Sequence, residues 1–263
     1  MKYFAELILL STITLSGSFA FAKSAKVPTK YASKQQSAVD KKDSKNKNVV
    51  CSTQSAYSAL IVIDMQPYFA IRGGQHNEPE NKEKIEKVIE VQIASIKKAI
   101  AAGIPIVFLE YECPPCDPTD SRLKAAVSGY KNVRFIKKTT DGMLDSDNKY
   151  RKELADFLNK NNIGTLIITG ANGGACVLES ITGALENNCN VVAYNAGIAD
   201  FNYKDFIYPY IGQYTEIKPN CKDCTFKEVF SIDKMAKLMV KSTYSSQSSY
   251  GTQQSSKSAI GVR

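Results

Sequence analysis

Three kinds of side chain that follow separate apolar segments could together carry out nucleophilic chemistry. Asp64 comes directly after a run of apolar residues, and Cys176 follows another such run and a turn rich in glycine. Between them in the sequence, the pair Lys137-Lys138 ends a shorter apolar segment. A carboxylate, an ammonium group and a thiol can act as proton acceptor, charge-stabilising group and nucleophile. The set therefore predicts covalent catalysis by a cysteine, provided that the fold brings these side chains together.

Each of these residues alone also has an ordinary structural explanation. Asp64 could cap a helix or lie in a loop, the two lysines could be solvated, and Cys176 could be buried or bonded to another cysteine. A carboxylate that directly follows a buried run is costly unless it has a partner or a task. Cys176 would begin a helix, where the helix dipole and free backbone N–H groups favour the thiolate. The functional interpretation depends on the combination.

The segments between these residues have the pattern of an α/β domain. Apolar runs typical of strands lie at 59–63, 104–109, 133–136, 165–169 and 191–194. The pattern predicts helices at about 82–102, 150–161, 176–188, 203–211 and 231–241, and a short strand near 225–226. Alternating strands and helices need crossover connections, so we expect a Rossmann-like three-layer α/β/α sandwich with a mainly parallel sheet of about six strands. In such sheets ligands bind beyond the carboxyl ends of the strands, where the three kinds of side chain stand.

Two of these strand ends resemble motifs of the isochorismatase-like cysteine hydrolases. The first motif of that family is similar to Asp64-Met65-Gln66-x-x-Phe69. The third motif is similar to the segment from Thr169-Gly170 through Cys176-Val177. The resemblance extends over about residues 57–200 and more loosely to 240, with the motifs in the family's order.

The lysine of the second motif is chosen by its spacing. In the family, the catalytic lysine stands four residues before a small or acidic residue, which a small and then an apolar residue follow. Lys137 fits this spacing with Asp141-Gly142-Met143, whereas Lys138 would be one residue out of register. The resemblance therefore predicts Lys137 as the catalytic lysine.

The resemblance implies a thiol hydrolase. Cys176 would be the nucleophile, Asp64 would take its proton and later pass it to the leaving amine, and Lys137 would hold the thiolate and carboxylate charges in place. Backbone N–H groups of Asn172 and Cys176 would form an oxyanion hole, with a cis peptide before Asn172. An acyl-thioester would form and then be hydrolysed by water. The further residues expected to line the oxyanion hole or contact the substrate are Ala171, Gln66 and Phe69.

Departures from the family pattern narrow the substrate. Nicotinamidase members carry a metal site with two histidines near the first motif, whereas His76 is the one histidine of this chain, so we expect no metal and no cofactor. Members that cleave the vinyl ether of isochorismate often lack the cysteine, so Cys176 favours an amide or ureide. Asn172-Gly173-Gly174 replaces a more usual threonine–asparagine pair, and Asn195-Ala196 stands where many members have Asp-Ala. The substrate itself stays open.

Residues 1–22 have the pattern of a secretory signal peptide. Lys2 precedes an apolar stretch, and Ala20 and Ala22 form an A-x-A cleavage site. We therefore expect an exported protein, periplasmic or secreted, with no membrane segment after cleavage.

Export changes how the seven cysteines are interpreted. An oxidising compartment favours disulfides, and an odd number leaves one thiol free, which we expect to be Cys176. The remaining cysteines are Cys51, Cys113, Cys116, Cys189, Cys221 and Cys224. Four of them form two C-x-x-C motifs, for which structural disulfides, a zinc site and a thioredoxin-like redox centre all stay open.

Composition divides the chain into four parts. A Lys-rich linker, 23–50, follows the signal peptide, residues 51–241 form the hydrolase domain, and a Ser- and Gln-rich tail, 242–263, ends the chain. The formal net charge of +8 arises from the linker and the tail, so the domain gives no reason to expect a nucleic-acid partner. We expect a small-molecule substrate, while homo-oligomer formation stays open.

The leading interpretation is an exported cysteine hydrolase that cleaves a C–N bond of a small amide or ureide. Two alternatives keep the same fold. One is a catalytically silent protein that serves as a surface or binding protein, and the other is a thiol-redox protein that uses its C-x-x-C motifs.

Overall fold

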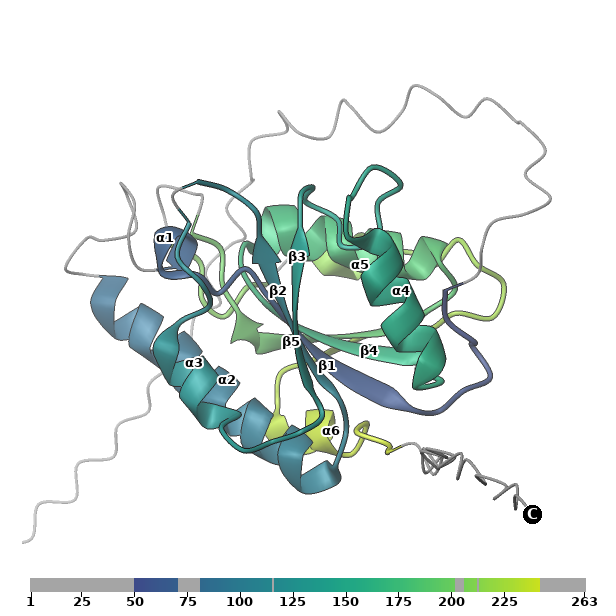
Figure 1. The fold of residues 1–263 in the computed structure, drawn as a ribbon, viewed down its shortest axis with the longest axis horizontal. Coiled ribbons are helices and arrows are strands. Elements are labelled where there is room, and N and C mark those ends of the chain that lie inside the picture. Colours follow the sequence, from purple (N-terminus) through teal and green to yellow (C-terminus); the bar gives the residue numbers. More distant parts are fainter. Residues whose placement is uncertain (1–49, 71–80, 115, 202–205, 212, 242–263) are drawn as a thin grey trace, which may run out of the picture. The chain divides into compact units, whose positions relative to one another are not determined.

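The structure is a computed structural model that describes residues 50–70, 81–114, 116–201, 206–211 and 213–241 (Figure 1). They all fall within one compact unit of the chain. The predicted signal peptide 1–22, the tail 242–263 and His76 lie outside the described residues, as does the linker 23–50 except for Val50. Among the helices that are described, none is both long and apolar enough to cross a bilayer.

A parallel sheet forms the middle of the domain. Its described strands are β1 (Ser58–Ile63), β2 (Ile106–Tyr111), β3 (Val133–Lys138), β4 (Thr165–Gly170), β5 (Asn190–Ile198) and β6 (Phe226–Val229). Their order is β3-β2-β1-β4-β5-β6, and every neighbouring pair is parallel. The fold predicted from the alternation of strands and helices is therefore confirmed.

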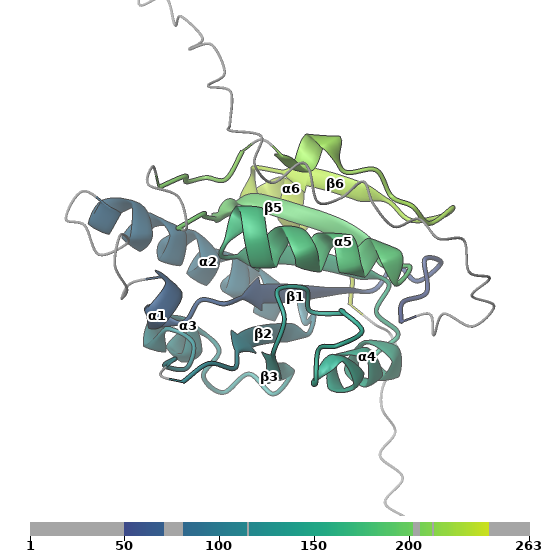
Figure 2. The ribbon, with the colours of Figure 1, turned by 90° about the horizontal axis from the view of Figure 1, so that it is seen from above.

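Helices cover both faces of this sheet. They are α1 (Pro67–Ala70), α2 (Lys82–Ala102), α3 (Ser121–Ala126), α4 (Arg151–Lys160), α5 (Leu178–Glu186) and α6 (Ile232–Ala236). A π-helical turn, Gly173–Val177, precedes α5, and a 3-10 turn, Gln213–Glu216, precedes β6. Figures 1 and 2 show α4 and α5 on one side of the sheet and α2, α3 and α6 on the other.

The pattern of β1 explains why its apolar run is continuous. Ala59, Ile61 and Ile63 pack into the core beneath α4 and α5, while Leu60 and Val62 pack into the core beneath α2. Successive side chains of a strand point to opposite faces, so a strand covered on both faces has no solvent-facing position. The alternation places both layers of helices directly against the strand that leads to Asp64.

Two segments differ in kind from the sequence prediction, while others differ in their bounds, such as α6, which ends at Ala236 although the helix was expected to reach 241. The helix expected near 203–211 is not formed by its described residues, because Ile207 pairs with Asp200 as an antiparallel bridge. Pro209 has no N–H to donate and disfavours helical backbone at the residue before it. Val50, the last residue of the predicted solvated linker, is instead buried, and its N–H donates to the carbonyl of Asn187.

The topology changes direction between β1 and β4, which lie side by side although β2 and β3 come between them in the sequence. Gly170 ends β4 with a φ of 130°, and a Cβ there would collide with the carbonyl oxygen of Ile63 at the end of β1. A side chain would therefore force the two strand ends apart. This close approach places the residues after β1 and after β4 at the switch point, where open α/β sheets bind their ligands.

Candidate active site

Asp64 is the first residue after β1, and its carboxylate is buried. Its φ of 48° is in the left-handed region, which turns the chain out of the sheet. The residue is 2% exposed, and Lys138 is the one N–H or O–H donor that reaches its side chain among the described residues, with Nζ 2.9 Å from Oδ2. A buried carboxylate with a single cationic partner keeps lone pairs that are not used by the fold.

The lysine that lies beside Asp64 is one residue later than the lysine predicted from the motif spacing. Lys138, not Lys137, points into the site, and it is fully buried. Lys137 is exposed on the opposite face of β3 and lies 3.5 Å from the carboxylate of Glu112. The physical reason is strand alternation: Ile136 packs into the core beneath α4 and α5, so the residue two positions later faces the same way.

Lys138 is held by groups that leave it no freedom to turn away. Its Nζ donates to the carbonyl oxygens of Thr140 and Asp141, at 2.9 and 3.2 Å. The ring of Tyr111, which pairs with Lys138 in the register of β2 and β3, lies 4.5 Å from the same nitrogen. The ammonium group is therefore fixed between Asp64 and the loop after β3.

Cys176 lies in the π-helical turn after β4, and it is the one free cysteine of the chain. The turn is fixed by a segment that follows β5. Tyr214 donates its hydroxyl to the carbonyl of Gly173 at 2.6 Å, and Asp200 accepts the N–H of Gly174 at 2.6 Å. A Cβ at Gly173 would collide with the ring of Tyr210, so this position requires glycine. The sulfur is thereby held at the switch point beside Asp64 and Lys138.

Electrostatics within the cluster set its resting charges. Burial, and after it the charge of Asp64, raise the pKa of the Cys176 thiol well above its ordinary value. Burial also raises the pKa of Asp64, against the opposing effect of Lys138. Burial lowers the pKa of Lys138, but the charges of Asp64 and Cys176 outweigh it and raise that pKa overall. The lysine is therefore charged, the thiol is protonated at rest, and the carboxylate is a stronger base than a solvated one.

This resting thiol corrects the expectation that the start of a helix would favour a thiolate at Cys176. Cys176 is 9% exposed and faces a carboxylate, and the effects of burial and of this charge on the thiol pKa exceed the attraction of Lys138. Deprotonation of Cys176 therefore requires a base.

The other predicted site residues take different places. Ala171 is buried and donates its N–H to Ile63, and the peptide bond between Ala171 and Asn172 is cis, as the family resemblance implied. The side chain of Asn172 accepts the N–H of Phe201. Phe69, in α1, is half-buried, with its ring edge-on to that of Tyr111 at a centroid distance of 6.0 Å.

Gln66 does not offer its amide to a substrate. Its Nε2 donates to the carbonyl oxygens of Tyr111 and Asp117, and its Oε1 accepts the N–H of Tyr111. The side chain is buried and ties the end of β2 to the loop that follows. Gln66 is therefore a positioning residue that holds Tyr111 beside Lys138.

The sequence analysis did not assign Asp141 or Tyr111 to the site. Oδ1 of Asp141 lies 3.4 Å from Cys176 Sγ, although the residue had served only to count the motif spacing. Tyr111 could have been found from strand register once Lys138 was known to face the site, because the two residues are paired. No spacing rule indicates Asp141, whose place depends on how the loop after β3 folds.

A metal ion finds no set of ligands in the part of the chain that the structure describes. No group of three or more His, Cys, Asp or Glu side chains there could hold one. Zinc in a catalytic site takes three protein ligands, commonly including histidine. The described residues near Asp64 therefore form no metal site by themselves, and no step of a mechanism is assigned to a metal.

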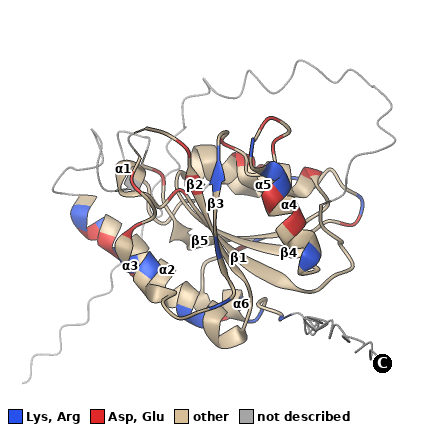
Figure 3. Cartoon of the chain, in the orientation of Figure 1, with Lys and Arg blue, Asp and Glu red and all other residues tan. Residues whose placement is uncertain are grey.

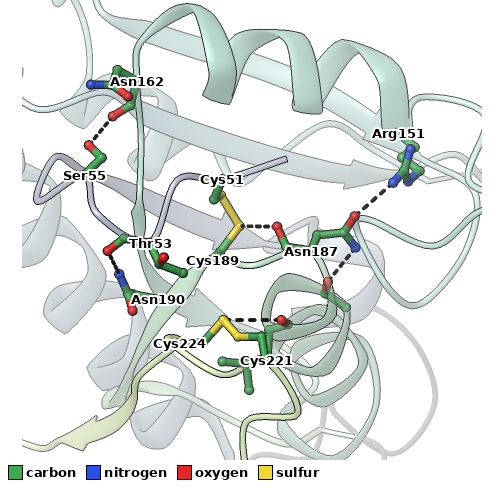
Figure 4. Close-up of a disulfide and its surroundings, with 12 residues drawn as sticks. Cys51, Thr53, Ser55, Arg151, Asn162, Asn187, Cys189, Asn190, Cys221 and Cys224 are labelled. Carbon is green, nitrogen blue, oxygen red and sulfur yellow. Dashed lines mark hydrogen bonds between the residues drawn. A yellow bond between two sulfur atoms is a disulfide. The ribbon is translucent and has the colours of Figure 1, made fainter. Parts of the chain in front are cut away.

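The six other cysteines pair with one another. Cys51 bonds to Cys189 across 138 residues of sequence, and the Cα atoms are 4.8 Å apart (Figure 4). The two C-x-x-C motifs pair internally, Cys113 with Cys116 and Cys221 with Cys224. Cys224 leads into β6 and Cys116 into a loop, whereas a thioredoxin-like centre begins a helix.

Charged residues of both signs are mixed along α2 and α4, while the charged residues on β3 are Lys and Arg (Figure 3). The exposed members on β3 are Arg134 and Lys137. The buried pair of Asp64 and Lys138 is set apart from this surface.

Comparison with known proteins agrees with the fold. Residues 58–206, more than half of the chain, match the family described as "Isochorismatase domain". No curated protein matches the sequence.

Several solved structures resemble the chain. The nicotinamidase of Staphylococcus aureus shares 20% identity over 56% of this chain and 86% of that one, with a TM-score of 0.44. A putative isochorismatase from Burkholderia xenovorans shares 21% over 57% and 72%, with a TM-score of 0.44. N-carbamoylsarcosine amidase from Thermoplasma acidophilum shares 18% over 65% and 96%, with a TM-score of 0.44. The family assignment rests on the domain match and not on these distant structures.

Proposed function

Because this chain belongs to the isochorismatase family of hydrolases, we propose that it is a cysteine hydrolase that cleaves a C–N bond of a small amide or ureide. Cys176 is the nucleophile of this reaction, Asp64 is its proton acceptor and Lys138 stabilises the charges. Lys138 takes the role that the sequence analysis had given to Lys137.

The observation that supports this proposal is the convergence of three side chains from three strand ends. Asp64 follows β1, Lys138 ends β3 and Cys176 follows β4. The carboxylate and the ammonium group form a buried ion pair, and both act on the pKa of the thiol. Burying this pair opposes folding by several kcal/mol before the mutual attraction is counted. A buried charge pair beside the one free thiol is typical of a catalytic site rather than of a structural core.

The first half of the reaction forms an acyl-thioester. Asp64 takes the proton of the Cys176 thiol as the sulfur attacks the carbonyl carbon, and the C=O π electrons move to the oxygen. Backbone N–H groups of Asn172 and Cys176 donate to this oxyanion. When the tetrahedral intermediate collapses, the C–N bond breaks and Asp64 returns the proton to the leaving nitrogen.

The second half restores the enzyme. Asp64 takes a proton from a water molecule, whose oxygen attacks the thioester carbon. The C–S bond then breaks, the sulfur regains a proton from Asp64, and the acid or carbamate product leaves. Throughout the cycle Lys138 keeps its charge, so it stabilises the thiolate without exchanging protons.

The site of action is part of the same proposal. The signal-peptide pattern of residues 1–22 favours export, to a periplasm or to the outside of the cell. Pairing of the cysteines other than Cys176 supports an oxidising compartment.

Rapid quenching of the reaction provides the direct test. The purified protein is mixed with a panel of small amides, ureides and vinyl ethers, quenched in acid after milliseconds to seconds, and digested for mass spectrometry. We expect an acyl group on Cys176 with an amide or ureide that is turned over, and none in Cys176→Ala. Turnover with no adduct and full activity in Cys176→Ala would overturn the mechanism. Turnover confined to vinyl ethers would overturn the proposed substrate class.

A further inference from the structure

The carboxylate of Asp141 lies next to the sulfur on the open side of the site. Its Oδ1 is 3.4 Å from Cys176 Sγ, and the residue is exposed, whereas Asp64 and Lys138 are buried. The backbone of Asp141 is held in place, since its carbonyl accepts hydrogen bonds from Lys138 Nζ and from the Ser180 hydroxyl. A substrate group bonded to the sulfur therefore lies beside a carboxylate carried by a solvent-exposed residue.

The charge of Asp141 is not neutralised by a neighbour. Lys138 is engaged by Asp64, and none of the ion pairs among the described residues includes Asp141. Glu179, at the start of α5, adds to the negative character of this rim. Burial raises the pKa of Glu179, and the charges of Asp145 and Asp141 raise it further. An anionic group that approaches Cys176 therefore meets repulsion.

An aromatic surface lies near the same carboxylate. Tyr111 lies between Lys138 and Phe69, with the ring contacts described above. Lys138 Nζ contacts both the ring of Tyr111, at 4.5 Å, and the carbonyl of Asp141, at 3.2 Å, and the charge of Asp141 adds to burial in raising the pKa of Tyr111. A carboxylate beside aromatic rings is a combination that favours quaternary ammonium and guanidinium groups over neutral or anionic ones.

We propose that Asp141 is a specificity-determining residue that selects small amides or ureides with a cationic group within a few bonds of the scissile carbonyl. This inference rests on the proposed function, because it names the substrate class for that reaction. Asp141 contacts the substrate group that flanks the carbonyl, while Asp64 accepts and returns the protons of the reaction.

The distance to the sulfur supports this assignment. In the acyl-enzyme the carbonyl carbon is bonded to Cys176 Sγ, and the carboxylate of Asp141 lies 3.4 Å from that sulfur. Substituents one or two atoms beyond the carbonyl then come within reach of the carboxylate. A cation at that place gains an interaction that a carboxylate-bearing substrate loses.

A second base beside the thiol is the competing explanation for Asp141. A base would change the rate for all substrates and reagents alike, because it acts on the sulfur. A specificity residue changes the ratio between the rate for a cationic reagent and the rate for an anionic one. Any effect on the reactivity of the thiol itself is the same for both reagents and cancels in this ratio. The ratio is therefore the quantity to measure.

Methanethiosulfonate reagents measure this ratio without a known substrate. The thiolate attacks the sulfenyl sulfur, a disulfide forms on Cys176 and methanesulfinate leaves. The 2-(trimethylammonium)ethyl and 2-sulfonatoethyl reagents are compared on wild type, Asp141→Asn and Asp147→Asn, with the rate read from intact mass and the site from peptide mapping. Asp147 is exposed on the same loop and serves as the control for net charge.

We expect wild type to react faster with the cationic reagent, and Asp141→Asn to lower the cation-to-anion ratio about tenfold. A unit charge about 6 Å from a carboxylate in water-like surroundings changes each rate about threefold, in opposite directions. Asp147→Asn should keep the wild-type ratio. An unchanged ratio in Asp141→Asn, an equal loss in Asp147→Asn, or a thiol that neither reagent reaches would overturn the inference.

Turnover extends the test to a matched substrate pair. (Trimethylammonio)acetamide and 3,3-dimethylbutanamide have the same shape and differ by one charge. We expect wild type to have the higher kcat/KM for the cation, with the preference lost in Asp141→Asn. If neither is turned over while the reagent ratio shifts, the result counts against the proposed hydrolysis and supports the charge selection by Asp141. Equal preference in wild type and Asp141→Asn would overturn the selection.

Discussion

The amino ends and the carboxyl ends of the strands, called here the amino edge and the carboxyl edge of the sheet, differ in the state of their cysteines and polar groups. Before the amino ends of β5 and β6, Cys189 and Cys224 are in disulfides, and the nearby polar side chains have hydrogen-bond partners (Figure 4). Asn187, for example, accepts from Arg151 and donates to the carbonyl of Gly183. At the carboxyl ends, the thiol of Cys176 is free, and a buried carboxylate has one N–H donor. The amino edge is therefore held by disulfides and hydrogen bonds, whereas the carboxyl edge keeps a free thiol and a carboxylate with unused lone pairs.

The difference shows that the same atom type can serve two purposes on one scaffold. Cys189 is fully buried and bonded, so it stabilises the chain and has no chemistry left. Cys176 is almost as buried, yet it faces Asp64 and Lys138, which can remove its proton and hold the charge. Removing a group at one edge should therefore affect stability, and removing one at the other should affect catalysis.

The largest expected effect comes from removing the nucleophile. Cys176→Ala should lower turnover of an amide or ureide by about 10⁴-fold or more, because no second thiol is near Asp64. Its melting temperature should stay within a few degrees of wild type, since alanine fills most of the space and no disulfide is lost. Steady-state turnover and thermal unfolding measure the two effects. Residual activity within tenfold of wild type would place the nucleophile elsewhere.

The adjacent lysines give a matched pair for the buried charges. Lys138→Met leaves the Asp64 carboxylate buried without a partner, which should lower the free energy of unfolding by about 3–5 kcal/mol and abolish turnover. Lys137→Met removes a surface pair with Glu112 and should leave both quantities nearly unchanged. Urea unfolding and turnover decide between them. A reversed result would restore Lys137 as the catalytic lysine.

The amino edge is tested by removing its long-range disulfide. Replacing Cys51 and Cys189 by alanine should lower the free energy of unfolding by about 2–5 kcal/mol, because the bond closes a loop of 138 residues. Turnover at 25 °C should stay within about twofold of wild type, as the bond lies at the far edge from the site. Replacing Cys113 and Cys116, which close a short loop, is the control and should cost less stability. Loss of turnover in the folded double variant would mean that the two edges are coupled.

The protonation of Cys176 predicts an unusual pH dependence. Its folded pKa is raised above the ordinary value of 9.0, so the iodoacetamide reaction should keep accelerating above pH 9, where an exposed cysteine levels off. Asp64→Asn removes the charge that helps raise this pKa, so it should speed alkylation at pH 8 severalfold while it abolishes turnover. A plateau near pH 9 in wild type would contradict the raised pKa.

The raised pKa of Cys176 also makes the free energy of unfolding fall at high pH. The unfolded chain releases the thiol proton near pH 9.0, whereas the folded chain retains it. Stability is therefore full below that pH and falls as pH rises above it. Cys176→Ala should show a smaller loss of unfolding free energy between pH 8 and pH 10 than wild type does.

The smallest expected effect is that of a chelator. Dialysis against EDTA should leave turnover unchanged, because the described residues near Asp64 offer no set of metal ligands. Metal analysis of the active protein measures the same point independently. Loss of activity that zinc or iron restores would require ligands beyond those described and would revise the mechanism.

The strand ends that the sequence predicted best are those of the central strands. Asp64 directly follows a run that is apolar at every position, and Cys176 follows, after a short turn, a strand whose inner residues 166–168 are apolar. The six-strand parallel fold follows from the same runs and from the helices between them. The sequence of a strand that is buried on both faces thus shows where the strand ends without a choice between two faces.

The edge strand β3 leaves two interpretations, which is why the lysine prediction failed. Phe135 and Ile136 are both apolar, so the sequence does not show which of them faces the core. The structure resolves the choice, since Ile136 is buried and Phe135 is 41% exposed. The place of Asp141 was likewise hidden, because it depends on hydrogen bonds from Lys138 to the loop and not on any period.

The contact between Tyr214 and Gly173 has a consequence for the order in which the protein is made. The hydroxyl that fixes the turn around Cys176 comes from a residue 41 positions later in the sequence. Synthesis proceeds from the amino end, so a nascent chain that already contains all of Asp64, Lys138 and Cys176 still lacks the support of its nucleophile. The turn that holds Cys176 is therefore complete only after the segment beyond β5 has been added, and a product that ends before Tyr214 would lack this hydrogen bond.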